Sequence, residues 1–490
     1  MNQPEAVQSP SSLAALRARY GPRHRWLFLL TVMIGTMAAI MSSTIISVAV
    51  PDLSRQFSLG QDRAQWVNSG FMVAMTVSML TTPWLLGRYG YRRTYMGAIW
   101  TLLAGGVLGG ISSNYELVLC MRVLEGLAAG VVQPIPVLII MRAFEPGEQG
   151  KASGFFGMGV VLAPAIGPSI GGFLVDWFGW RSIFFMVVPF CICALVMAAR
   201  YLPTSAPGGV QPGSGSTLDW RGLLLATVGT LCLLNGLVNL HGGQHVVSAL
   251  LLVVFAVCLV GFWWWQQRCA EPLMAPALFA YRPFAMGSVV AFIYGAALFG
   301  STYLLPVFMQ LGLSLSASHV GTIMLPAGIV LAFTIPLVAR SADHVARHLL
   351  VSTGLVLLSI SFALMVLITK ASPLWLLVAF SVLGRVGLGF VLPSLNLGAM
   401  GGMDKALIAQ ASSTINFLRM LGGSVGVSLC GIFLEWRMST LPHGADAQSP
   451  FAQTFGLLAA VCALSIFAAW QLRTKAPQHK APPKSTPTQG

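Results

Sequence analysis

The chain has 490 residues, of which 56% are hydrophobic and only 9% are charged. Roughly 25% of the residues of a soluble domain are charged, so this composition excludes a soluble globular protein and predicts an all-α polytopic membrane protein. The net charge of +14 would suggest nucleic-acid binding in a soluble chain, but in a membrane chain the positions of the charges first report topology.

Apolar stretches of about 20 residues, long enough to cross a bilayer as a helix, recur along the whole chain. We count about fourteen of them, at residues 26–48, 66–86, 95–112, 117–141, 152–175, 182–199, 222–240, 246–266, 284–309, 319–338, 349–369, 374–397, 407–434 and 451–472. An even number of spans places both termini on the same side of the membrane.

The basic residues are distributed unevenly between the two sides. With the N-terminus assigned to the cytoplasm, 20 of the 28 lysine and arginine residues lie in cytoplasmic segments and 5 lie outside. The others, Arg122, Arg385 and Arg419, lie within predicted spans. This bias follows the positive-inside rule. We therefore expect both termini in the cytoplasm and no nucleic-acid partner.

Hydroxyl groups gather near the outer end of the first span, at Ser42, Ser43, Thr44 and Ser47. At this depth hydroxyls most often bond to carbonyls of their own helix, which favours a structural role over ligand contact. Ser42 is nevertheless a candidate for lining a substrate cavity.

The loop after the second span, residues 87–93, is short and basic. Such a loop can clamp neighbouring helix ends and anionic headgroups, and a plain topology signal is the alternative. Arg88, Gly90 and Arg92 are therefore candidates for a loop that controls conformation.

The stretch Cys120–Pro134 is the one hydrophobic run with charges of both signs well inside it. At a helical step of about 100° per residue, Arg122, Glu125 and Gln133 fall on one broad face. A charge that faces lipid is costly, so this face must look into protein or a water-filled cavity. We interpret it as the wall of a polar path, with Arg122 and Glu125 close enough to pair. The alternative is a structural ion pair that holds two helices in register.

Small residues recur at every fourth position of the fifth span. They are Gly159, Ala163, Gly167 and Gly171, with Pro164, Pro168 and Gly172 interleaved. This spacing predicts a helix packed almost backbone to backbone on another. The prolines remove helix hydrogen bonds and would bend the span unless neighbouring helices compensate.

Residues 201–219 are rich in Pro, Gly and Ser and predict a flexible cytoplasmic linker. The two spans within 220–270 carry no charge in their middles, so we expect them at the periphery.

Beyond them, Arg385, Asn416 and Arg419 are further substrate-cavity candidates. Three embedded arginines against one embedded acid disfavour a cation and suit a carboxylate.

Several motifs together resemble those of the major facilitator superfamily, in particular its fourteen-span drug:proton antiporter branch. The motifs are T-I-I-S-V-A-V-P at 44–51, R-V-L-E-G at 122–126, G-P-S-I-G-G at 167–172, A-R-S-A-D at 339–343 and N-F-L-R-M-L-G-G-S-V-G at 416–426. In the superfamily the fourth of these repeats the first cytoplasmic loop in the second half of the chain, which adds Asp343 to the conformational-loop candidates.

The resemblance implies a particular architecture and mechanism. Two six-helix bundles, 26–200 and 271–473, would flank the linker 201–219 and the additional spans of 220–270, with cytoplasmic tails at 1–25 and 474–490. The protein would export an amphipathic or weakly acidic organic compound, such as a drug, a metabolite or a siderophore-like molecule. It would work in a bacterial inner membrane by alternating access, with proton entry as the driving force. Its partners would be the organic substrate, protons and the lipid bilayer, and a periplasmic adaptor and an outer-membrane channel are candidates for further partners.

The chain departs from that branch at the residues that matter for coupling. The branch usually has an aspartate where Ser42 stands, an aspartate where Gly87 stands, a glutamine where Glu125 stands and an asparagine where Val187 stands. Glu125 is the only acid far from every predicted span end. A proton-driven transporter needs a group that titrates within the membrane, so we expect Glu125 to bind the coupling proton.

Other classes of function are alternatives. A facilitator or solute exchanger of the same fold would move no proton, and a membrane receptor or scaffold would bind without transport. The run from Gly167 to Gly171 also fits the G-x-S-x-G pattern of hydrolases, but the 8 histidines all lie in loops, tails or span ends, so Ser169 has no evident histidine to activate it. We therefore expect no enzyme, no cofactor and no metal site.

Overall fold

The computed structural model describes residues 13–145, 147–204, 217–241, 244–440 and 448–473. The side chains of residues 13, 14, 17, 47, 48, 51, 61, 62, 65, 161–169, 172, 241, 317 and 318 lie outside this description. Within these residues the chain forms helices and no strand. The helices are α1 (Leu13–Tyr20), α2 (His24–Gln56), α3 (Gln61–Ser78), α4 (Thr82–Ile111), α5 (Tyr115–Val132), α6 (Ile135–Ala143), α7 (Gln149–Phe178), α8 (Ser182–Tyr201), α9 (Trp220–His241), α10 (His245–Gln266), α11 (Ala277–Ala280), α12 (Arg282–Val307), α13 (Ala317–Ser341), α14 (Arg347–Met365), α15 (Leu374–Met400), α16 (Ile408–Ser439) and α17 (Ser449–Trp470).

Twelve stretches of the described chain are helical, long and apolar enough to cross a membrane. One of them, Trp66–Ile111, has 46 residues and covers two predicted spans. The chain bends between these two at Gly90, whose φ of 78° only glycine adopts readily. The 30-residue helix α7 covers the predicted span 152–175 and is not among the twelve. All of the predicted spans therefore coincide with helices. The expected polytopic all-α fold is confirmed.

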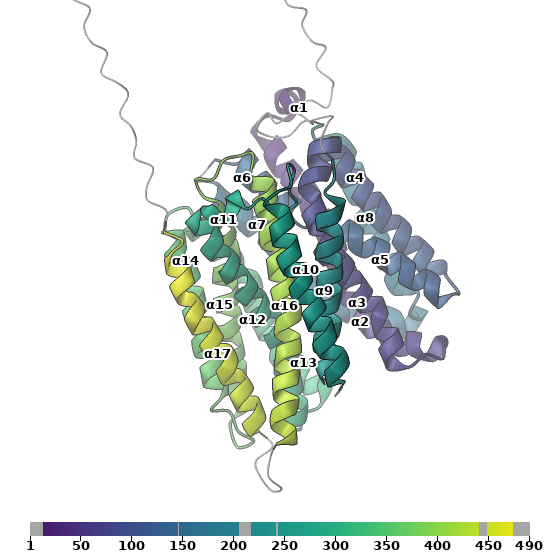
Figure 1. Cartoon of the computed structure of the whole chain (residues 1–490), viewed down its shortest axis with the longest axis vertical. Helices are drawn as coiled ribbons and strands as arrows, with labels where there is room; N and C mark the ends of the chain where they lie inside the picture. Colours follow the sequence, from purple (N-terminus) through teal and green to yellow (C-terminus); the bar gives the residue numbers. More distant parts are fainter. Residues whose placement is uncertain (1–12, 146, 205–216, 242–243, 441–447, 474–490) are drawn as a thin grey trace, which may run out of the picture.

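The helices pack in two groups. The N-terminal helices, α2–α8, contact one another chiefly through α2 with α7 and α8, and through α5 with α3 and α4. The C-terminal helices, α12–α17, pack chiefly through α12 with α16 and through α15 with α13 and α14. Figure 1 shows the two groups side by side, with α7 of the first packed against α13 of the second.

Helices α9 and α10 form a hairpin at the boundary of the two groups (Figure 1). Helix α9 packs on α16 and on α3, so it contacts both groups. Helix α10 exposes a row of valines, Val253, Val257 and Val260, each at least 60% accessible. A helix surface of this kind is stable against lipid tails and not against water, so the hairpin lies at the periphery of the bundle.

Asp219, the last residue of the predicted linker, joins the start of α9 to the end of α10. Its Oδ1 accepts hydrogen bonds from the backbone N–H of Gly222 at 2.8 Å and from Trp265 Nε1 at 2.8 Å, and its Oδ2 accepts from Gln266 Nε2 at 2.7 Å. The carboxylate thus caps the start of α9 and holds the end of α10 against it.

We name the two ends of the bundle by their loops. The terminal face carries α1, the bend at Gly90 and the loops 144–148, 342–346 and 401–407, and it lies at the top of Figure 1. The distal face carries the loops 112–114, 179–181 and 366–373. Helix α5 runs from the distal face towards the terminal face, and α16 runs in the opposite direction.

Candidate functional site

The charged pair predicted from spacing lies in α5 and is almost completely buried. Arg122 and Glu125 are each 2% exposed, and Arg122 Nη1 forms an ion pair with Glu125 Oε2. The pair is one helical turn apart, which brings side chains at i and i+3 together on one face. Neither charge faces the outside of the bundle, as the cost of exposing a charge to lipid requires.

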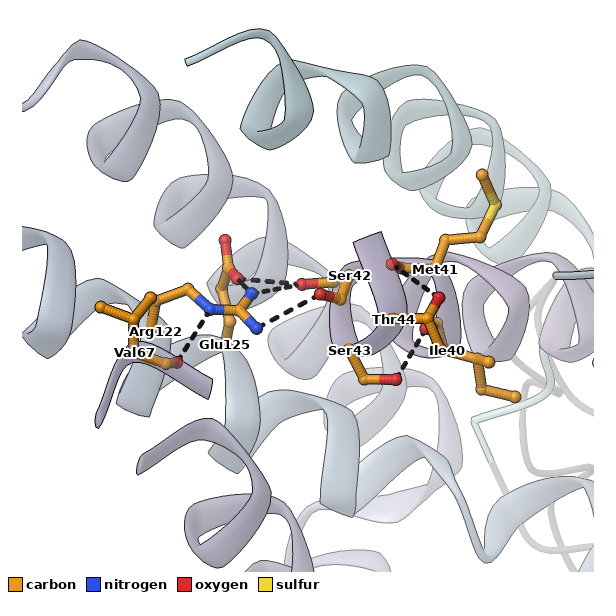
Figure 2. Close-up of polar contacts among 8 residues, drawn as sticks. All are labelled: Ile40, Met41, Ser42, Ser43, Thr44, Val67, Arg122 and Glu125. Carbon is orange, nitrogen blue, oxygen red and sulfur yellow. Dashed lines mark hydrogen bonds and ion pairs between the residues drawn. The ribbon is translucent and has the colours of Figure 1, made fainter. Parts of the chain in front are cut away.

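Ser42 joins this pair from α2. Arg122 Nη1 donates a hydrogen bond to Ser42 Oγ at 2.8 Å, and Ser42 Oγ donates in turn to Glu125 Oε2 at 3.0 Å. Arg122 Nη2 also donates to the backbone carbonyl of Ser42 at 3.2 Å. Figure 2 shows the three side chains converging, so the residue that replaces the usual acid of the branch is a direct partner of both charges.

A third helix completes the environment of the arginine. Arg122 Nε donates to the carbonyl of Val67 in α3 at 3.4 Å, and its guanidinium lies 4.2 Å from the centre of the Phe71 ring. Arg122 therefore has a carboxylate, a hydroxyl, two carbonyls and an aromatic face around it. Its charge is fully compensated in this conformation.

Glu125 fits against two glycines of α4. A Cβ added at Gly105 would lie 2.6 Å from Glu125 Cγ, and one added at Gly106 would lie 3.6 Å from Glu125 Oε1. The space beside the pair is a small pocket of about 10 Å³, lined by Ser42, Arg122, Glu125 and apolar residues of α2 and α8. One water molecule at most fits there, so the pair has almost no contact with solvent in this conformation.

The other hydroxyls of the first span behave differently from Ser42. Ser43 Oγ donates to the carbonyl of Ile40 at 2.7 Å, and Thr44 Oγ1 donates to the same carbonyl at 3.1 Å. These two bond to their own helix as expected, whereas the Ser42 hydroxyl bonds to the charged pair instead of to a carbonyl of its own helix. The side chain of Ser47 lies outside the described residues.

Gln133 is buried but is not part of this network. It lies at the end of α5, and its amide group has no hydrogen-bond partner among the described residues. It lies beside Pro134, whose carbonyl accepts a hydrogen bond from Ser412 Oγ of α16 at 2.9 Å. Gln133 thus borders the contact between the N-terminal and C-terminal helices.

The remaining cavity candidates lie together among the C-terminal helices. Arg419 Nη2 donates to Asn416 Oδ1 at 2.9 Å, and Asn416 Nδ2 donates to the carbonyl of Ser412 at 2.9 Å. Arg385 of α15 has no hydrogen-bond partner in the part of the chain that is described. Both guanidinium groups interact electrostatically with Tyr294 of α12, a residue that sequence reasoning missed because a lone tyrosine in an apolar span carries no signal.

The small residues of α7 that can be described pack closely on α2. A Cβ added at Gly159 would lie 2.6 Å from Met33 Sδ, and one added at Gly171 would lie 2.4 Å from Ile45 Cγ1. These distances are far below a normal contact, so the prediction of close packing holds at both positions. The side chains of Ala163, Pro164, Gly167, Pro168 and Gly172 lie outside the described residues.

The conformational-loop candidates occupy two different places on the terminal face. Arg92 Nη2 donates to the carbonyl of Ala199 at 2.8 Å, so the loop clamps the end of α8, with Arg88 exposed beside the bend at Gly90. Asp343 instead crosses between the groups. Its Oδ1 and Oδ2 accept hydrogen bonds from the backbone N–H groups of Gly150 and Lys151 at 2.7 Å and 3.1 Å.

The terminal face is therefore closed. The Asp343 carboxylate caps the N-terminus of α7, and a Cβ at Gly150 would lie 2.1 Å from the carbonyl of Ala339 in α13. On the other side of the interface, Arg142 Nη2 donates to the carbonyl of Lys405 at 2.5 Å. Among the described residues no group of three or more histidines, cysteines or acids could hold a metal ion.

Comparison with known proteins agrees with this arrangement. The family model of the Major Facilitator Superfamily matches residues 32–427. The multidrug export protein EmrB of Haemophilus influenzae is 28% identical over 88% of this chain and 85% of its own length. Multidrug resistance protein 3 of Bacillus subtilis is 28% identical over 82% of this chain and 78% of its own length.

A solved structure shares the fold. The crystal structure of the human organic anion transporter MFSD10 (TETRAN) superposes with a TM-score of 0.68 at 15% identity, and the match covers 91% of this chain and 99% of that one. The family match, the relatives named for multidrug export and the helical architecture together exclude an enzyme and identify a transporter. The chain belongs to the Major Facilitator Superfamily.

Proposed function

We infer that this transporter exports an amphipathic or weakly acidic organic compound from the bacterial cytoplasm in exchange for protons. The observation that carries this proposal is Glu125, a carboxylate that is 2% exposed and paired with Arg122 in the middle of the N-terminal helices. Two of the compared relatives are named for multidrug export and multidrug resistance, which supports the direction of transport.

The coupling follows from the balance of charge at the pair. Burial favours the protonated form of a carboxyl group, while a neighbouring guanidinium favours the ionised form. A change in water access or in the contacts of Arg122 therefore shifts Glu125 between its two forms. Proton binding at Glu125 frees Arg122 from its carboxylate, and ionisation restores the pair seen in Figure 2.

Alternating access supplies the route. We assign the terminal face to the cytoplasm and take residues 26–200 and 271–473 as the two bundles that rock against each other, with 201–219 as a linker and 220–270 as peripheral spans. The closed contacts at Asp343 and Arg142 correspond to the state in which the cytoplasmic side is sealed. A binding site near the midplane would then face the opposite side.

The test is transport by purified protein in liposomes, with and without an imposed pH gradient. The compound comes from a thermal-shift screen of carboxylates, cations and siderophore-like compounds. Glu125→Gln should abolish accumulation driven by the gradient and keep downhill exchange. Glu148→Gln is the matched control, because Glu148 pairs with Arg25 at the terminal face rather than in the core. Accumulation by the Glu125 variant would refute the coupling role.

A facilitator or exchanger is the second candidate. It is favoured by the presence of Ser42, a group that does not titrate, at the position of the usual acid of the branch. If the wild-type protein ignores the pH gradient but exchanges its compound, this candidate replaces the first. A periplasmic adaptor and an outer-membrane channel stay a prediction, and copurification from crosslinked membranes would test it.

A further inference from the structure

Two arginines of the C-terminal helices lie deep in the bundle without an acidic partner. Arg385 is about 16 Å along α15 from its distal end, and Arg419 is about 16 Å along α16 from its terminal end. The ion pairs of the described chain are Arg25 with Glu148, Arg55 with Asp52, and Arg122 with Glu125. Neither Arg385 nor Arg419 is among them.

No described carboxylate of the C-terminal helices forms an ion pair with either arginine. Glu435 is 16 positions from Arg419 in the same helix, about 24 Å away along it, and Asp404 lies in the loop before α16, whose first residue is about 16 Å from Arg419. Asp343 is engaged at the N-terminus of α7 on the terminal face. The two positive charges are therefore uncompensated by protein in this conformation.

The hydrogen bonds of Arg385 and Arg419 do not replace the missing acidic partner. Arg419 uses Nη2 on Asn416, while its Nε is buried and has no partner. Arg385 makes no hydrogen bond within the described residues, in contrast to Arg122 with its four oxygen partners. An isolated charge inside a bundle is strongly disfavoured unless an anion or water compensates it.

The face of α16 that carries Arg419 meets the N-terminal helices near the start of α16 and packs on α12 farther along. Ser412, Asn416 and Arg419 are spaced i, i+4 and i+7, which places them on one face of a helix. Ser412 on this face bonds to the carbonyl of Pro134, at the junction of α5 and α6. Arg419 lies about two turns farther from the terminal face, where a Cβ added at Gly295 of α12 would lie 1.9 Å from the Arg419 carbonyl.

The depth of this position matches that of the proton site. From the Ser412 to Pro134 contact, Arg419 lies about 10 Å along α16 and Glu125 about 13 Å along α5, both towards the distal face. Arg419 and Glu125 thus lie at a similar depth in the bundle. Tyr294, which is 3% exposed, interacts electrostatically with both guanidinium groups, and its neighbour Gly295 packs against the backbone of Arg419.

We propose that Arg385 and Arg419, with the Tyr294 hydroxyl, form the subsite that binds the anionic group of the transported compound, a carboxylate or a sulfonate. Asn416 is a positioning residue, because it orients Arg419 through its side-chain oxygen. Guanidinium groups suit these anions because they donate paired, charge-assisted hydrogen bonds. The inference rests on the proposed export function and specifies which end of the compound the C-terminal helices recognise.

The test measures equilibrium binding to purified protein in lipid nanodiscs at a single pH, so that no gradient and no transport step is involved. The probes are naphthoate, anthracene carboxylate and naphthalene sulfonate, each with its uncharged primary amide. The wild-type protein should bind the anions more tightly than the amides. Loss of one charge-assisted contact in Arg385→Gln or Arg419→Gln should weaken anion binding about tenfold to a hundredfold and leave amide binding unchanged.

Two further variants keep the test decisive. Arg419→Lys retains the positive charge and should recover part of the preference for anions, which a purely structural role of Arg419 would not predict. Arg437→Gln, in the same helix but bonded to Gln453 near the distal end, should behave as wild type. Variants are compared only as monodisperse protein. If Arg419→Gln does not fold, the comparison is made with Arg419→Lys.

The proposal is overturned if no anion of the panel binds more tightly than its amide, or if both glutamine variants keep the preference. This result is independent of the proton coupling. Glu125→Gln should retain anion binding under the same conditions, so a failure of coupling in liposomes leaves the anion subsite standing, and a missing anion preference leaves the coupling standing.

Discussion

The contact of Asp343 with α7 predicts how strongly the terminal face is held closed. Both carboxylate oxygens accept backbone N–H groups, from Gly150 and from Lys151. In Asp343→Asn one oxygen becomes an NH₂ group that faces an N–H donor, and the negative charge at the helix N-terminus is lost. The variant should therefore populate conformations in which α7 and α13 separate at this face.

The magnitude follows from the two interactions that are lost. A hydrogen bond to a charged group contributes about 1.5 to 3 kcal/mol, and a negative charge at a helix N-terminus about 0.3 to 1 kcal/mol. Together they amount to about 2 to 4 kcal/mol, and only the state with the contact formed is affected. The ratio of closed to open terminal faces should fall roughly 30- to 700-fold at 1.4 kcal/mol per tenfold.

Spin-label distances measure this ratio directly. Labels on cysteines introduced at Gly147 and Val345, in a background without the native cysteines, lie on either side of the contact in exposed loops. The wild-type protein in nanodiscs should give a short distance, and Asp343→Asn should add a longer one. Asp404→Asn is the matched control, because Asp404 accepts a hydrogen bond only within its own loop, from Ala406 N at 3.0 Å.

An unchanged distance distribution in Asp343→Asn would refute the reasoning, since the contact would then not hold the two groups together. Equal opening by the Asp404 variant would also refute it, because a general change of surface charge would explain the effect.

Three further predictions follow from single contacts. Gly105→Ala places a Cβ 2.6 Å from Glu125 Cγ, so overpacking should lower the free energy of unfolding by about 1 to 3 kcal/mol and reduce pH-driven transport in liposomes. Gly97→Ala, with open space around the added Cβ, should change neither. Asp219→Ala removes an acceptor of three hydrogen bonds and should lower the melting temperature by loss of at least about 2 kcal/mol, while the exposed Glu116→Ala should not; an equal effect of both would contradict the role of Asp219. Reporter fusions at Pro207 and Pro483 should read cytoplasmic and those at Asp62 and Ala445 outside, and a cytoplasmic signal at Ala445 would contradict the topology.

The spans and the charged pair could be predicted because each depends on local physics. A bilayer requires about 20 apolar residues for each helix, so every predicted span coincides with helix. The Arg122 and Glu125 pair follows from a spacing of three residues on one helix. The small residues at Gly159 and Gly171 similarly predict close packing without naming the partner helix, which proves to be α2.

The partners that lie far apart in the sequence could not be predicted. Ser42 is 80 positions from Arg122. Its hydroxyl bonds to the charged pair rather than to a carbonyl of its own helix, because hydrogen bonds to charged groups are stronger than those to neutral ones. Tyr294 had no signal at all, since its place beside two arginines depends on how α12, α15 and α16 converge. The bond of Asp343 to the start of α7 likewise depends on the packing between the two groups of helices.

The contacts on the terminal face are asymmetric, and this has a consequence for the transport cycle. On one side the carboxylate of Asp343 holds α7, whereas the corresponding loop of the N-terminal helices has Gly87 in place of an acid. That second side is joined instead through the carbonyl of Lys405, which accepts from Arg142. A bond from a cation to a carbonyl lacks the helix dipole that strengthens the Asp343 contact. Opening of this face should therefore begin on the Arg142 side, with Asp343 as the last contact to break.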